Sequence, residues 1–256
     1  MRLITQIPPE FTKDPGFGNQ DLALYRSVKQ LLLLSEVECK PSLYLVQALL
    51  LISSYEIGHG LESAAYLSIG TCARLAILLG LHRRSAEPAD LVSTEEASRT
   101  WWGIVIVESF YLPLDDDAWD DEVCQKLASS QPVLTMLSDK EAVSTESNPS
   151  LTPISMTTSS DVQAGPFARE AQAATLLGRT FTHITTPTSD AEFNMAECQQ
   201  LDRTLTSFLT VLPAEDLLKP CTAYCGAMGI CIRSVMIAFN NVFHYNGIET
   251  ELFAAS

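Results

Sequence analysis

The sequence has little positive charge. It holds 16 Lys and Arg residues against 31 Asp and Glu residues, which gives a formal net charge of −15. A protein that binds nucleic acid needs clustered Lys and Arg, because phosphate neutralisation supplies most sequence-independent affinity. The only basic cluster is His82-Arg83-Arg84, which follows a predicted helix end, where positive charge suits the helix dipole. We therefore expect no DNA-binding residues in this chain and no affinity for an anionic membrane surface.

The sequence pattern predicts neither a leader peptide nor a membrane span. The first residues, MRLITQIPPEF, lack the apolar core of a signal peptide. The longest apolar stretch, residues 221–243, is interrupted by Arg233, Asn240 and Asn241. A buried helix explains that stretch better than a membrane span. The apolar content of 46% is typical of a soluble globular protein.

The cysteines do not form a metal-binding pattern. There are 7 of them, an odd and scattered set without a C-x-x-C pair, and several lie in apolar helical runs. We interpret them as reduced, buried, small hydrophobic residues. Cys221 and Cys225 would share a helix face, but Cys231 would point elsewhere. We therefore expect no metal site and no cofactor in this chain.

Helical periodicity dominates the centre of the sequence. One face collects apolar residues at alternating steps of four and three, which is typical of a half-buried α-helix: Ala65, Ile69, Cys72, Ala76 and Leu79. Gly80 predicts the end of this helix in a left-handed turn. Ser42 is a candidate cap for the preceding helix and Asp190 for a later one, while Ser93 and Glu96 form a candidate capping box.

The whole pattern predicts an all-α fold, a multi-helix bundle with a flexible Ser/Thr/Pro-rich linker in the middle. We expect helices at about residues 21–38, 42–57, 62–80, 94–112, 167–185, 190–212 and 219–245, the last two separated by Pro213. The expected organisation is an irregular lead-in (1–20), a helical core (21–122), a flexible linker (123–165) and C-terminal helices packing on the same domain (166–256). The linker is too polar to offset its ordering entropy, apart from one short helical piece near 132–137.

Residues 40–120 contain several distinctive pieces in a fixed order and spacing. These are the run 47–51, the helix 66–74, the turn Gly80-Leu81-His82-Arg83, the pair Trp101-Trp102 and an acidic segment with Asp116 and Trp119. In the order and spacing of these pieces the chain resembles the fungal-specific transcription factor domain, the regulatory middle region of fungal zinc-cluster regulators. The loop that the family places between the two tryptophans and the acidic segment is much shorter here.

The resemblance implies a nuclear protein that regulates transcription in response to an inducer or through a partner. It implies no enzymatic activity, and partners in the transcription machinery or a second copy of the chain. The family's zinc cluster, rich in cysteine, lysine and arginine, is not in these 256 residues. DNA contact, and zinc with it, would therefore belong to a module outside this sequence or would have been lost.

A second function fits one motif. Asp116, Asp117 and Asp120 match D-D-x-x-D, with which all-helical isoprenoid synthases bind Mg²⁺ and a diphosphate. However, Pro113 and the run of aspartates favour a solvated acidic loop over a helix facing a cavity. A second metal motif is absent from the C-terminal helices, and the sequence has no serine-nucleophile, phosphate-loop or dinucleotide motif. We therefore predict no catalytic residues.

Overall fold

A computed structural model describes residues 17–38, 40–83, 91–110, 135–136, 154–155, 164–216 and 225–245. The chain divides into an N-terminal unit, Met1–Tyr111, and a C-terminal unit, Leu112–Ser256. The all-α prediction is confirmed, because nearly all the described residues are helical. Whether residues 166–256 pack on the N-terminal helices stays a prediction.

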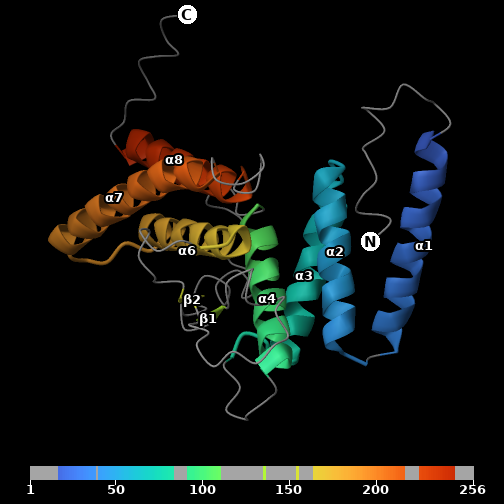
Figure 1. The fold of residues 1–256 in the computed structure, drawn as a ribbon. Helices are drawn as coiled ribbons and strands as arrows, with labels where there is room; N and C mark the ends of the chain where they lie inside the picture. Colours follow the sequence, from blue (N-terminus) through green and yellow to red (C-terminus); the bar gives the residue numbers. More distant parts are fainter. Residues whose placement is uncertain are drawn as a thin grey trace, which may run out of the picture. The chain divides into compact units, whose positions relative to one another are not determined.

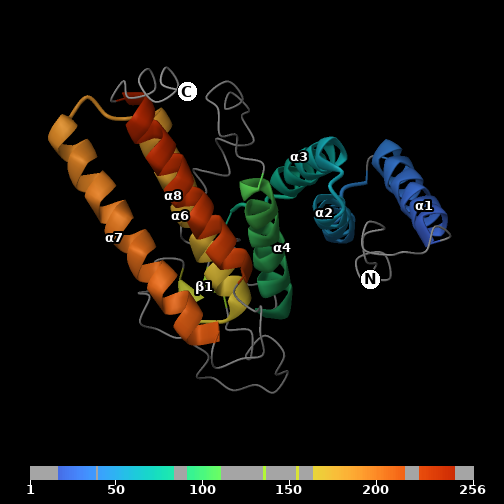
Figure 2. The same cartoon turned by 90° about the horizontal axis from the view of Figure 1, so that it is seen from above.

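The N-terminal unit consists of α1 (Phe17–Val37), α2 (Leu43–Gly58), α3 (Glu62–Leu78) and α4 (Leu91–Ser109). Helices α2 and α3 pack side by side, α4 contacts both, and α1 stands next to α2 (Figures 1 and 2). The predicted cap of α2 is confirmed, since the Ser42 side chain accepts a hydrogen bond from the Leu45 amide at 3.2 Å.

The core of this unit follows the predicted face of α3. Ala65, Ile69, Cys72 and Ala76 are fully buried, whereas Leu79 is only half-buried. The buried apolar residues of α2 are Val46, Leu49, Ile52 and Tyr55. Because α2 packs against both α3 and α4, these side chains complete the core of the unit.

Helix α3 ends as the sequence predicts. Gly80 has φ 75°. Its amide donates to the Ile77 carbonyl at 2.9 Å, and the Leu81 amide donates to the Ala76 carbonyl at 3.0 Å. These are the two hydrogen bonds of a Schellman motif, and they satisfy carbonyls that a helix end would leave unpaired. The short connection between α2 and α3 ends α2 in the same way, with φ 67° at Gly60.

We expect Gly80→Ala to destabilise the chain by about 1–2 kcal/mol, because a side chain disfavours the left-handed backbone. Gly58→Ala is the matched control. Both glycines have open space where a Cβ would lie, but only Gly80 has a positive φ. Gly58→Ala should therefore be neutral or slightly stabilising. Urea denaturation measures both, and equal midpoints would contradict the role of the left-handed turn.

The C-terminal unit consists of β1 (Thr135–Met136), β2 (Ile154–Ser155), α6 (Pro166–Thr185), α7 (Ala191–Asp216) and α8 (Cys225–Tyr245). Helices α6 and α8 pack closely and α7 contacts both. The buried face of α7 has regular helical spacing and consists of Leu201, Leu205, Phe208 and Leu212. The guanidinium of Arg169, fully buried in α6, lies 5.4 Å from the centroid of the Phe208 ring.

Three local predictions are wrong. Helix α4 begins at Leu91, so Ser93 lies inside its first turn and cannot be the cap of a capping box. Helix α7 continues through Pro213 to Asp216. The short helical piece expected near 132–137 is replaced, at Thr135 and Met136, by an antiparallel pairing with Ser155 and Ile154. Most of the predicted linker, 123–165, lies outside the described residues.

Candidate functional site

The first candidate site is the signature turn Gly80–Arg83, which connects to α4 through one aromatic contact. The His82 ring lies 5.8 Å from the Trp101 ring, at an interplanar angle of 51°. Arg83 is exposed, and its Nε donates to His82 Nε2 at 3.0 Å. The structure thus brings together His82 and Trp101, two parts of the signature that are separated in the sequence.

Trp101 and Trp102 are both buried, with 0% and 1% of their surfaces exposed. Neighbouring residues on a helix point in different directions, so α4 is covered on more than one side. Because both rings are fully buried, the two tryptophans contribute to the packing of the core and do not offer an exposed surface to a ligand.

The acidic part of the signature lies outside the described residues, and with it Asp116, Asp117, Trp119 and Asp120. Within the described ranges, no group of three or more His, Cys, Asp or Glu residues is arranged to hold a metal ion.

The second candidate site is a partly buried polar cluster, the Glu56 cluster, made of Tyr25, Lys29, Glu56 and Ser68. Glu56 Oε1 accepts a hydrogen bond from the Tyr25 hydroxyl at 2.6 Å and lies 3.0 Å from Lys29 Nζ. Lys29 Nζ also donates to Ser68 Oγ at 2.6 Å. The Glu56 side chain is 0% exposed. A buried carboxylate is costly unless it is paired, and here its partners come from α1.

An aromatic stack continues this cluster along α2. The Tyr25 and Tyr55 rings are stacked with centroids 5.6 Å apart, and the Tyr55 and His59 rings are stacked at 3.8 Å. Burial raises the pKa of Tyr25, and the hydrogen bond to Glu56 raises it further. The phenol therefore stays protonated and remains a donor to the carboxylate. The arrangement stabilises a charge and ties three helices together.

Sequence reasoning missed the Glu56 cluster. One signal was available, because Glu56 is the only charged residue in α2, whose sequence is LYLVQALLLISSYEIG. A single carboxylate in an apolar helix is expected either at an exposed position or with a buried partner. The partner could not be chosen from the sequence, since Tyr25 lies 31 residues away.

The described cysteines are free and fall into two classes. Cys72 and Cys231 are buried, as predicted, whereas Cys198 and Cys225 are exposed, which contradicts the prediction for these two. Burial raises the pKa of Cys231 to about 12, and burial together with the nearby Glu108 raises that of Cys72. Cys72 remains a thiol and donates to the Val46 carbonyl at 3.2 Å.

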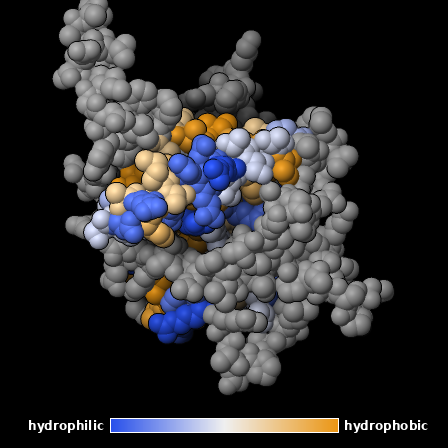
Figure 3. Space-filling model, turned by 90° about the vertical axis from the view of Figure 1, so that its left-hand side faces the viewer, coloured by the Kyte–Doolittle hydropathy of each residue, from blue (hydrophilic) through white to orange (hydrophobic). Residues whose placement is uncertain are grey.

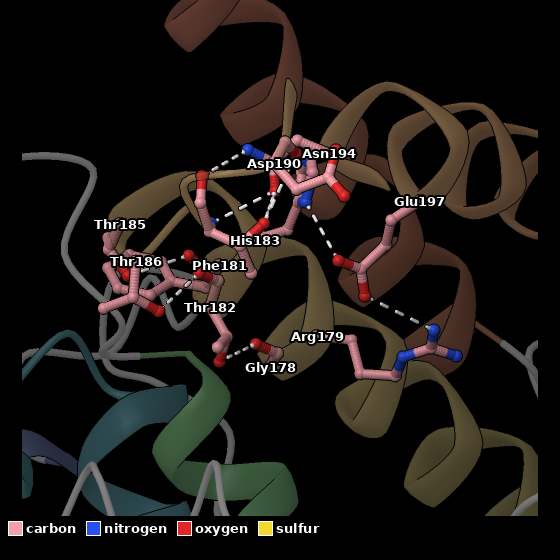
Figure 4. Close-up of polar contacts among 11 residues, drawn as sticks. Gly178, Arg179, Phe181, Thr182, His183, Thr185, Thr186, Asp190, Asn194 and Glu197 are labelled. Carbon is pink, nitrogen blue, oxygen red and sulfur yellow. Dashed lines mark hydrogen bonds and ion pairs between the residues drawn. The ribbon is translucent and has the colours of Figure 1, made fainter. Parts of the chain in front are cut away.

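The C-terminal unit has a polar corner where α6 meets α7 (Figure 4). Asp190 caps α7 as predicted, accepting from the Glu192 and Phe193 amides at 3.0 and 3.1 Å. Glu197 of α7 lies 3.2 Å from His183 Nδ1 and 3.8 Å from the Arg179 guanidinium, both on α6. These contacts are partly exposed, so each contributes little to the stability of the corner.

The surface near this corner is mixed in character. The side that is on the left in Figure 1, where α7 begins, carries hydrophilic and hydrophobic residues intermingled (Figure 3). Phe193 and Met195 are 52% and 61% exposed. Over the described residues, every helix is too short or too polar to cross a membrane.

Comparisons with known proteins agree with the sequence pattern. Residues 9–112 match the fungal specific transcription factor domain. "Transcription factor BOA15" of Botryotinia fuckeliana (strain B05.10) is 41% identical over 68 residues, which are 27% of this chain and 38% of that protein. The chain therefore matches less than half the length of this curated relative. No solved structure matches the chain. The predicted resemblance to this family is confirmed over residues 9–112.

Proposed function

We propose that this chain is the regulatory part of a fungal zinc-cluster-type transcription factor. It controls transcription by responding to an inducer or by contacting a partner, and it does not bind DNA by itself. The observation that supports this proposal is the match of residues 9–112 to the transcription factor family, because this segment covers the helices of the N-terminal unit. The relative named as a transcription factor adds support.

We propose further that the chain acts in the nucleus and has no enzymatic activity. It works through protein partners of the transcription machinery or through a second copy of itself. DNA is reached through a zinc-cluster module or a partner, and zinc belongs to that module. A net charge of −15 favours such indirect DNA contact over direct phosphate binding.

A reporter assay tests the regulatory role. We expect the full chain, fused to an unrelated DNA-binding domain in a fungal host, to change reporter output relative to that domain alone. The Ile69→Asp fusion is the control, because an unpaired charge at this buried position should unfold the N-terminal unit. A wild-type fusion that leaves reporter output unchanged, at equal protein level, would contradict a regulatory role.

A gel-shift titration tests the absence of direct DNA binding. At about 150 mM salt, the weak attraction of a few dispersed basic residues is screened. We therefore expect the purified chain to form no complex that discriminates between a random duplex and candidate promoters. A submicromolar complex that does discriminate would place DNA recognition within this chain and overturn that part of the proposal.

A further inference from the structure

Over its described side chains, helix α1 buries little apolar surface in the N-terminal unit. Leu32 is buried, at 8% exposed, and Leu24 and Val28 are half-buried. Leu34 and Val37 are 63% and 78% exposed. Apolar burial usually holds a helix on its domain, so with this limited apolar contact α1 depends on further contacts.

The polar contacts that hold α1 are centred on Glu56. Tyr25 and Lys29 both reach Glu56 Oε1 of α2, and Lys29 also reaches Ser68 of α3. Within the described part of the chain, Glu56 Oε2 is buried and has no hydrogen-bond partner. The charge of this carboxylate therefore depends on α1 alone, and Lys29 is the group that neutralises it.

Such a contact favours two distinct states, one with α1 docked and one with α1 released. While α1 is docked, Glu56 is paired and shielded from solvent. When α1 leaves, water replaces Lys29 and Tyr25 around the carboxylate, so the loss of the ion pair is partly compensated. The packed core of α2, α3 and α4 loses little apolar contact in this step. Local openings of this kind occur where buried apolar contacts are few.

We propose that α1 is a releasable strap, fastened to the α2–α4 core by the pairing of Lys29 and Tyr25 with Glu56. Release exposes the Glu56 cluster to solvent and leaves the α2–α4 core folded. The inference concerns the mechanics of the N-terminal unit and does not depend on the proposed function. Its test uses the purified full chain and needs no DNA, partner or inducer.

Hydrogen exchange measured by mass spectrometry tests the strap. In the wild-type chain we expect amides of α1 to exchange faster than those of α2, α3 and α4. Lys29→Met should speed exchange in α1 by about tenfold or more, because the docked state would then hold an unpaired buried charge. Exchange in α2, α3 and α4 should stay unchanged, because Glu56 becomes hydrated once α1 has left.

Two matched variants distinguish the loss of the Lys29–Glu56 pair from a general effect of removing a positive charge from α1. Arg26→Met removes the same charge from an exposed position of α1 and should leave exchange unchanged. Lys29→Met combined with Glu56→Gln removes both charges and should bring α1 exchange back toward the wild-type rate. As in a double-mutant cycle, that recovery would show that the interaction between Lys29 and Glu56 holds α1 on the core.

Several results would overturn the strap. If α1 of the wild type exchanged as slowly as the other helices, it would be an integral part of the core. If Lys29→Met sped exchange equally in all four helices, or prevented folding, α1 would likewise be an integral part of the core. An unchanged α1 in Lys29→Met, or no recovery in the double variant, would show that the Glu56 pairing does not fasten the helix.

Discussion

Replacement of Ile69 by aspartate should unfold the N-terminal unit. Ile69 is 0% exposed and lies on the face of α3 that packs in the core. The variant loses the burial of a large apolar side chain and places a charge where no partner is available, at a cost of several kcal/mol. Because domains are stable by only about 5–15 kcal/mol, we expect the melting temperature to fall by more than about 10 °C.

Leu67→Asp is the matched control for this experiment. It introduces the same residue two positions earlier on the same helix, where Leu67 is 68% exposed. Exposed substitutions usually change stability by less than about 0.5 kcal/mol, so this variant should melt close to the wild type. Circular dichroism of the full chain measures both. If Ile69→Asp melted with the wild type, the assignment of the core face of α3 would be wrong.

The buried face and the end of α3 were predicted well because both are determined by residues close together in the sequence. Helical spacing identified the buried positions Ala65, Ile69, Cys72 and Ala76, and Gly80 marked the left-handed end. The buried face and the C-terminal turn are both encoded within about twenty residues, without information from the rest of the chain. The caps at Ser42 and Asp190 were predictable for the same reason.

Helix α7 shows where local rules are not enough. Proline removes one backbone donor and disfavours helix, so Pro213 suggested a boundary. However, the buried face of α7 extends to Leu212, which is 0% exposed, and the helix continues for one short turn beyond it. Near a helix end the loss of one hydrogen bond is affordable when the preceding residues are fixed by tertiary packing.

The candidate sites depended on packing that the sequence does not show. His82 and Trp101 belong to the predicted signature, but their ring contact requires the turn after α3 to meet α4. The Glu56 cluster requires α1 to lie against α2 and α3, with Lys29 and Ser68 39 residues apart. The pairing of Thr135 with Ser155 is also non-local. The predicted linker, residues 123–165, was based on composition. Composition carries no information about which strand pairs with which, so this pairing could not be predicted.

Trp101→Ala should have the other large effect. Trp101 is fully buried, and large-to-small core changes of this kind cost about 3–5 kcal/mol through lost burial and the cavity left behind. The Trp101 Nε1 atom is buried without a hydrogen-bond partner in the described part of the chain. The expected loss is therefore one of packing, and it should be visible as a lower urea midpoint.

Trp101→Phe distinguishes packing from polar contact. Phenylalanine keeps an aromatic ring beside His82 and removes the unsatisfied N–H, so it should cost much less than alanine. Tyr44→Ala is the control, because Tyr44 is 77% exposed on α2 and its loss should leave the midpoint unchanged. If Trp101→Phe cost as much as Trp101→Ala, the indole would have a polar role that packing does not explain. A small cost for phenylalanine and a large one for alanine would show that Trp101 acts through the packing of its ring in the core.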